Sequence, residues 1–313
     1  MQNKELTYRV LTYSDSDSVV NLCKRFNIYL KNNLIQKVCA KKWDDLSTDC
    51  IGYGCFDKNQ LIGYIGSIQA HRNELIVNDL TCGIVDDAYR GNGIATKLFT
   101  MANADGDIVL DLTPSEQVYQ MYKRHFPQFK DLSEYQLWFN CKKLKKNNNL
   151  VCVSEINEII NAASDVEKKL IRDNSKLMMS FALIKLDNES TIIGYYTMKK
   201  KKIIKGFEII YISNRLLFEK HFEAILKSIS KINKSFFAFV DKRWLPIANF
   251  EGNIMPRGTN SKQYIKRMSK LCFKKYIKAP NRKLVCFNNG HSESMINMLD
   301  YLYTEMSLYK DLN

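Results

Sequence analysis

Histidine is scarce in this sequence, and pairs of closely spaced cysteines are absent. Both kinds of residue often bind metals in proteins. The four histidines lie far apart, at His71, His125, His221 and His291. The nine cysteines are an odd number without paired short spacings, which argues against a disulfide scaffold and against a structural zinc site. We therefore predict no metal centre, and we expect the cysteines to be reduced thiols in apolar surroundings.

Long apolar runs are also absent. No stretch approaches the roughly 20 apolar residues of a transmembrane helix, and the first ten residues lack the apolar segment of a secretory signal. The chain has 313 residues, of which 45% are hydrophobic, so it can form two domains that each bury a core. We expect a cytoplasmic protein that does not enter a membrane.

Positive charge is unevenly distributed. Residues 1–150 contain 19 Lys and Arg against 17 Asp and Glu, a net charge of +2, whereas residues 151–313 contain 28 against 16, a net charge of +12. The densest basic runs are Lys199–Lys202 and Lys262–Lys283. This asymmetry indicates a polyanion, such as nucleic acid, near the second half. A composition biased toward Lys and Asn is the alternative explanation, and the sequence leaves both open.

A basic and then polar segment, residues 141–150, separates two regions of regular hydrophobic patterning. It has no periodicity and is typical of a linker. We therefore predict one domain over residues 1–146 and a second, basic domain over residues 150–313.

The patterning of the first region predicts an α/β domain. Its mixed, mostly antiparallel sheet has helices on both faces, because short turns join the central strands whereas a helix precedes a later parallel strand. The expected strands are 8–13, 50–56, 61–69, 75–85, 107–112 and 138–144, and the expected helices are 16–26, 33–42, 92–102 and 115–125.

The second region weakly repeats the first. The segment Thr191–Thr197 resembles Gln60–Gly66, and each follows a polar turn. A strand at 207–212, a helix at 215–231 and a strand at 236–240 then follow in the same order as in the first region. We predict two tandem copies of one fold.

The segment that carries chemistry lies between a strand and a helix of the first region. It reads Arg90-Gly91-Asn92-Gly93-Ile94-Ala95. The first turn of a helix has unpaired backbone N–H groups and a positive dipole end, and glycine lets a phosphate approach them closely. With a cation from Arg90, this loop is suited to a diphosphate. No Gly-Lys-Ser/Thr sequence follows, as a P-loop would require.

This segment resembles the acyl-CoA signature of the GNAT superfamily of N-acyltransferases, Arg/Gln-x-x-Gly-x-Gly/Ala. Arg90, Gly93 and Ala95 occupy its defining positions, although Asp87-Ala88 replaces the usual Pro-Glu. The family's next helix carries Asn-x-x-Ala followed by a tyrosine, and Ser115, Val118 and Tyr122 keep that spacing. The family's following Glu-Lys-x-Gly-Phe becomes Lys123–Phe129 here, without the glycine. The resemblance covers residues 5–145.

The resemblance implies acetyl-CoA, or another acyl-CoA, as cosubstrate. The residues implied to bind it are Gly83, Ile84, Val85, Arg90, Gly91, Asn92, Gly93, Ile94, Ala95 and Ser115. Tyr122 occupies the family's usual position for the acid that protonates the CoA sulfur. The base that deprotonates the amine stays open among Asp79, Glu74 and a chain of water molecules.

The implied activity is transfer of an acyl group to an amine, and the expected acceptor is a small molecule such as an amino sugar, an amino acid or a polyamine. An alternative is a GNAT-fold protein that acts on tRNA or a modified DNA base, with the basic second half as the docking surface. The junction at Ile210–Lys220 has no glycine, so the second copy should lack an acyl-CoA site. We therefore expect one acyl-CoA per chain. The acyl chain length and the oligomeric state stay undetermined.

Overall fold

The computed structural model divides the chain into two compact units. The first contains the described residues up to Leu132 together with the late strand β14, and the second contains those from Tyr135 to Pro280. The structure describes residues 5–26, 49–72, 75–112, 114–132, 135–175, 179–200, 204–245, 250–254, 267, 270–271, 274–280 and 284–288.

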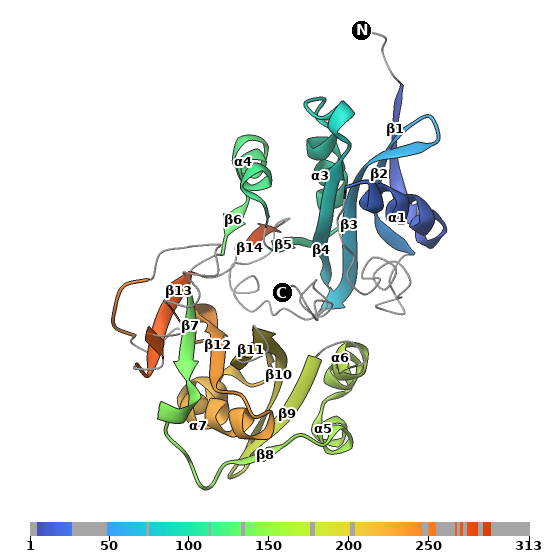
Figure 1. Cartoon of the computed structure of the whole chain (residues 1–313). Helices are drawn as coiled ribbons and strands as arrows, with labels where there is room; N and C mark the ends of the chain where they lie inside the picture. Colours follow the sequence, from blue (N-terminus) through green and yellow to red (C-terminus); the bar gives the residue numbers. More distant parts are fainter. Residues whose placement is uncertain are drawn as a thin grey trace. The chain divides into compact units, whose positions relative to one another are not determined.

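The first unit is built on a seven-stranded sheet with the order β1-β2-β3-β4-β5-β14-β6 (Figure 1). Its strands are β1 (Leu6–Thr12), β2 (Cys50–Asp57), β3 (Gln60–Arg72), β4 (Leu75–Val85), β5 (Ile108–Leu112), β6 (Lys130–Asp131) and β14 (Leu284–Asn288). Its helices are α1 (Ser16–Arg25), α3 (Ile94–Ala104) and α4 (Glu116–His125). Among the described strands of this sheet, only β4 and β5 pair in parallel. The predicted mixed α/β fold is confirmed; the helix predicted at 33–42 lies outside the described residues.

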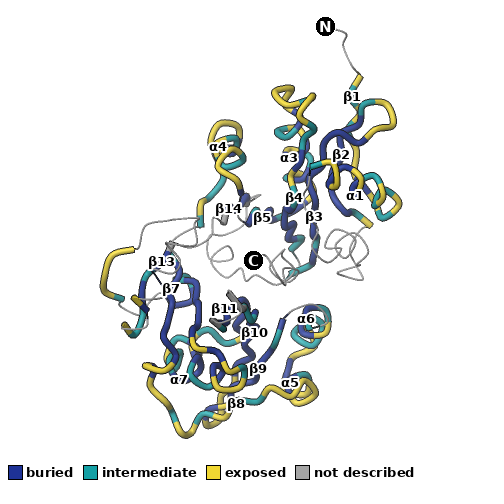
Figure 2. The backbone as a smooth tube through the Cα atoms, in the orientation of Figure 1, coloured by how far each residue is buried: buried dark blue, intermediate teal, exposed yellow. Residues whose placement is uncertain are grey.

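Helices cover both faces of this sheet. Leu61 and Ile62 are neighbours on β3, and side chains of neighbouring strand residues point to opposite faces. Leu61 packs in one buried cluster with α1, whereas Ile62 packs in another with α3 and Tyr122 of α4. Figure 2 shows the resulting pattern, in which the central strands are buried and the outer surfaces of the helices are exposed.

The second unit has its own seven-stranded sheet, with the order β13-β7-β12-β11-β10-β9-β8. Its strands are β7 (Tyr135–Asn140), β8 (Val151–Val153), β9 (Met179–Leu186), β10 (Glu189–Lys200), β11 (Ile204–Ile212), β12 (Phe237–Asp241) and β13 (Tyr276–Pro280). Its helices are α5 (Ile156–Ala162), α6 (Asp165–Ser175) and α7 (Arg215–Ile232).

The two units repeat one strand pattern, which confirms the predicted tandem fold. An antiparallel meander, β2-β3-β4 or β9-β10-β11, is followed by a helix and then by a parallel strand, β5 or β12. Both meanders begin with a two-residue hairpin whose first turn residue, Lys58 or Asp187, has a positive φ. Such φ values suit tight hairpin turns, in which the chain reverses between paired strands.

The units are not consecutive in sequence, which differs from the predicted division at 146–150. Strand β7, expected at the end of the first domain, pairs with β12 and β13 in the second sheet. Strand β14 returns to the first sheet and lies between β5 and β6. The polar segment at 141–150 is therefore a connection inside the second unit, between β7 and β8. Strand periodicity indicates which face is buried and does not identify the pairing partner.

Among the helices that the structure describes, none has the length and apolar character needed to cross a membrane.

The packing of β2 on β3 yields a test of the first sheet. Gly52 has φ +143°, and a Cβ atom there would lie 2.2 Å from the carbonyl oxygen of Ile65. Gly91 also has a positive φ, +84°, yet its Cβ would meet no atom within 4 Å. We expect Gly52→Ala to lower the unfolding free energy by about 3 kcal/mol, and Gly91→Ala by about 1 kcal/mol. Calorimetric unfolding of both variants measures the difference, and equal losses would contradict this packing.

Candidate active site

The first unit opens where its two parallel strands separate. The last residues that β4 and β5 pair are Leu80 and Asp111. Strand β4 nevertheless continues to Val85. Beyond Leu80 it is paired with β3 alone, so a space opens between the end of β4 and the segment that follows β5.

A β-bulge lies at the start of this separated segment. Tyr64 pairs with Ile84 and Gly66 with Thr81, so Cys82 and Gly83 together face the single residue Ile65. Cys82 has φ 50°, in the left-handed region that is uncommon for residues other than glycine. A bulge bends a strand and changes the direction of its backbone groups. Here it bends β4 next to the opening.

The glycine loop leads directly from β4 into helix α3. Gly93 is the N-cap of α3, has φ +72°, and provides no side chain to cap the first turn. A Cβ atom on Gly91 or Gly93 would meet no other atom within 4 Å. Both glycines are exposed, and so is Asn92 between them. The backbone of the first helical turn is thus accessible to an anion. Ile94, also predicted to bind the cosubstrate, is the first residue of this helix, and its side chain packs in the core.

Two arginines near this loop, Arg90 and Arg25, each pair with an acidic residue. Arg90 forms an ion pair with Asp87 at 2.7 Å, and its Nε donates to the carbonyl oxygen of Val85 at 3.3 Å. Asp86 accepts a hydrogen bond from Arg25 at 2.8 Å. Because the Arg90 side chain is 64% exposed, its ion pair contributes little to stability. A phosphate can therefore replace Asp87 as its partner at low cost.

A cavity of about 640 Å³ occupies the opening. Seven of the predicted site residues line it: Gly83, Ile84, Val85, Arg90, Ala95, Ser115 and Tyr122. The other described lining residues are Phe26, Tyr64, Ile65, Leu80, Thr81, Cys82, Asp111, Leu112, Pro114, Gln117, Val118 and Met121. Ser115 also caps α4, since its Oγ accepts from the N–H of Val118 at 3.3 Å. Gly91, Asn92 and Gly93 are not among the described lining residues. Arg90 before them and Ala95 after them are, so the cavity extends from the two ends of the loop to Tyr122.

Tyr122 and Asp111 form a hydrogen-bonded pair at the cavity wall. The hydroxyl of Tyr122 donates to a carboxylate oxygen of Asp111. Burial raises the pKa of Tyr122 well above its ordinary value, and the charge and the hydrogen bond of Asp111 raise it further. The phenol is therefore protonated at neutral pH. Sequence analysis did not identify Asp111; the available signal was a carboxylate between two leucines, Leu110 and Leu112, at the end of a buried strand.

Asp79, predicted as a candidate base, does not reach the cavity. It is fully buried on β4 and is not among the described residues that line the opening. The described residues of β4 that line the cavity are Leu80 to Val85, all of them beyond Asp79. Glu74 lies outside the described residues.

The corresponding junction of the second unit is closed. Helix α7 begins after Asn214, whose side chain accepts from the N–H of Leu217 at 3.1 Å. The backbone N–H of Asn214 donates to Oγ1 of Thr191 at 3.0 Å. These side chains occupy the donors that the glycine loop of the first unit leaves accessible. That the second unit binds no acyl-CoA stays a prediction.

The carboxylate of Asp111 should control the ionisation of Tyr122. We expect Asp111→Asn to lower the pKa of Tyr122, because the negative charge that disfavours the phenolate is removed. The pKa should still exceed the ordinary value of 10.0, since burial is its largest cause. NMR of tyrosines labelled with ¹³C at Cζ, assigned with Tyr122→Phe, measures this titration. An unchanged titration would show that the two groups do not interact.

The whole chain is similar to several solved structures. No protein-family model and no curated protein matches the sequence. A GCN5-related N-acetyltransferase from Anabaena variabilis is similar in structure, with a TM-score of 0.55, 10% identity, and coverage of 90% of this chain and 72% of the other. A second, from Kribbella flavida, has a TM-score of 0.50, 8% identity, and coverage of 90% and 70%.

A tandem GNAT protein from the clavulanic acid biosynthesis pathway is also similar. Its TM-score is 0.52 at 9% identity, and the match covers 92% of this chain and 100% of the other. At these identities the likeness shows the fold. The chain therefore has the GNAT fold, in two tandem copies.

Proposed function

We propose that this protein transfers an acyl group, in the simplest case acetyl, from acyl-CoA to an amine. The observation that carries the proposal is a cavity lined by Arg90 and Ala95, on either side of the uncapped helix start at Gly93, and by the Tyr122–Asp111 pair. The helix start suits the diphosphate of CoA, and the pair suits the proton transfers of acyl transfer. The GNAT fold of the chain supports both assignments.

In this proposal the separated end of β4 binds the donor. Backbone N–H groups at Gly83 to Val85 hold the acyl carbonyl oxygen and stabilise the negative charge that develops on it. The first turn of α3 and the guanidinium of Arg90 bind the diphosphate. Ser115 lines the same cavity from the start of α4 and contacts the arm that joins the diphosphate to the sulfur.

Asp111 replaces Asp79 as the proposed base, because it is the only carboxylate among the described residues that line the cavity. Its carboxylate takes a proton from the ammonium group, and the neutral amine attacks the thioester carbonyl. When the carbon–sulfur bond breaks, Tyr122 protonates the leaving thiolate. The proton held by Asp111 then passes along their hydrogen bond to the phenolate. The second proton of the nitrogen leaves to solvent, so the charges balance.

The cavity favours an acceptor with one charged amine. Arg90 is the only cation and Asp111 the only anion among its described lining residues, whereas Thr81, Ser115 and Gln117 offer neutral polar groups. The additional ammonium groups of a polyamine would find no described carboxylate there. Of the small acceptors considered, an amino sugar fits this lining best, since hydroxyl groups pair well with neutral polar side chains.

No described residue supports the alternative role on nucleic acid. Residues 201 and 202 of one basic run lie outside the described residues, as do most of residues 262–283 of the other. The charge asymmetry between the two halves of the sequence is the only observation that points to this role.

We expect one acyl-CoA to bind per chain, in the first unit. Gly93→Val should abolish binding without unfolding the protein, because its side chain would enter open space where the diphosphate approaches the helix. Gly252→Val is a matched control, since Gly252 also has a positive φ and open surroundings but lies in the second unit. Calorimetric titration with acetyl-CoA measures both. Two equivalent sites, or equal losses in the two variants, would contradict the assignment.

We expect Tyr122→Phe and Asp111→Asn each to lower kcat by about 100-fold with a smaller effect on KM for the acyl donor. Because the two residues act on one proton path, the double variant should be no slower than the slower single variant.

Tyr119→Phe is a matched control on the same helix. The hydroxyl of Tyr119 also donates to a carboxylate, Asp131, at 2.6 Å, and neither residue lines the cavity. Steady-state kinetics with a panel of amino sugars and simple amines makes the comparison. If Tyr122→Phe leaves turnover unchanged, Tyr122 is a core aromatic and the proposed acid is wrong.

A further inference from the structure

The last described strand of the sequence completes the first sheet next to the cavity. Strand β14 is separated from β5 by more of the chain than any other paired strand of that sheet, yet it lies between β5 and β6. Its central residues Val285, Cys286 and Phe287 are fully buried. Burial of such side chains stabilises a fold, so β14 is an integral part of the first unit.

Strand β14 remains paired with β5 beyond the point where β4 separates from it. Val285 pairs with Asp111, and Leu284 pairs with Leu112. The pairing of β4 with β5 ends at Asp111, so Leu112 has a partner on β14 and none on β4. The backbone that carries Asp111 past the opening is therefore fixed from the β14 side.

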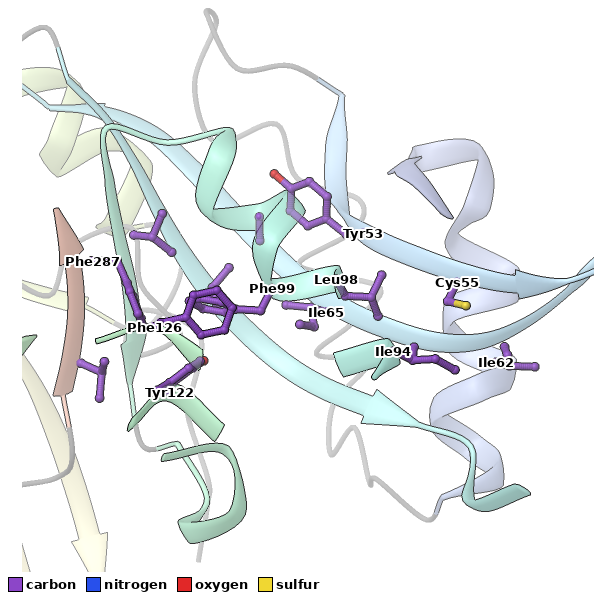
Figure 3. Packing of buried hydrophobic residues seen from close by; sticks show 14 residues of the cluster. Tyr53, Cys55, Ile62, Ile65, Ile94, Leu98, Phe99, Tyr122, Phe126 and Phe287 are labelled. Atoms are coloured by element: carbon purple, nitrogen blue, oxygen red, sulfur yellow. The ribbon is translucent and has the colours of Figure 1, made fainter. Parts of the chain in front are cut away.

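The same strand contacts the other member of the pair. The ring of Phe287 packs edge-on against the ring of Tyr122, with centroids 5.0 Å apart and planes at 74°. Phe99 of α3 packs against Tyr122 at 4.6 Å and against Phe287 at 4.6 Å. Figure 3 shows these rings together, with Phe126 beside them. Tyr122 is 2% exposed, so its ring has little freedom to move.

We infer that Phe287 is a positioning residue for the Tyr122–Asp111 pair, and that β14 thereby makes the far end of the sequence part of the catalytic machinery. The inference rests on the proposed function. Phe287 is not among the described residues that line the cavity. It acts by fixing the phenol ring at hydrogen-bonding distance from Asp111, while Val285 fixes the backbone of Asp111 itself.

The test compares Phe287→Leu with Phe56→Leu in the full-length protein. Phe56 is a buried phenylalanine of the same unit, in the cluster on the opposite face that includes α1. We expect Phe287→Leu to lower kcat by about 10-fold or more, since small displacements of catalytic groups have large effects on rate. KM for the acyl donor should change less than kcat, and Phe56→Leu should leave kcat close to wild type.

A double variant that carries Phe287→Leu together with Tyr122→Phe distinguishes a positioning role of Phe287 from a general loss of structure. In the Tyr122→Phe background, Phe287→Leu should have almost no further effect on kcat, because the group that it positions is already missing. Equal losses in the two backgrounds, or an equal loss in Phe56→Leu, would overturn the inference. If Phe287→Leu does not fold, Phe287→Met provides an unbranched side chain that adapts to an irregular space while removing the ring, and the same comparison applies.

A second readout needs no turnover. In ¹³C-Cζ tyrosine NMR, Phe287→Leu should lower the pKa of Tyr122. In the wild-type protein burial raises this pKa, and in the variant water would reach the phenol and stabilise its charged form. Phe56→Leu should not change this pKa. If this pKa shift appears but no amine is acylated, the proposed function is wrong, whereas the contact by which Phe287 positions Tyr122 is confirmed. If Tyr122→Phe slows the reaction but Phe287→Leu changes neither kcat nor the titration, the inference alone fails.

Discussion

The separation of β4 from β5 after the Leu80–Asp111 pair is the constraint on which the site depends. Two parallel strands that stayed paired would leave no space between them, and the glycine loop would lead into a closed sheet. The bulge at Cys82 and Gly83 bends β4, while β14 keeps β5 in place through Leu112. The cavity, the accessible start of α3 and the Tyr122–Asp111 pair all follow from this opening.

The two copies of the fold differ at one junction, and that difference explains why only one is proposed to bind acyl-CoA. The first copy enters its helix through Gly93, with an open backbone, whereas the second enters through Asn214, whose side chain caps the helix. An N-cap side chain stabilises a helix by about 1 kcal/mol. The first copy thus forgoes this local stabilisation at the point where an anion can replace the cap.

Local features of the site could be predicted from the sequence, and distant ones could not. The glycine loop, the strand before it and the helix that carries Tyr122 are local patterns of turn residues and apolar spacing. The pairing of β7 with the second sheet and of β14 with the first joins residues far apart in the chain, which periodicity does not specify. Asp111 was missed because its role appears only when α4 brings Tyr122 to the end of β5.

Hydrogen–deuterium exchange of the full-length protein with and without acetyl-CoA tests the central claim most directly, because it locates the ligand without assuming a reaction. The account predicts slower exchange of backbone amides over residues 81–95, where β4 separates and α3 begins, and unchanged exchange over residues 213–217 at the start of α7. Protection at the start of α7, or at neither helix start, would contradict it.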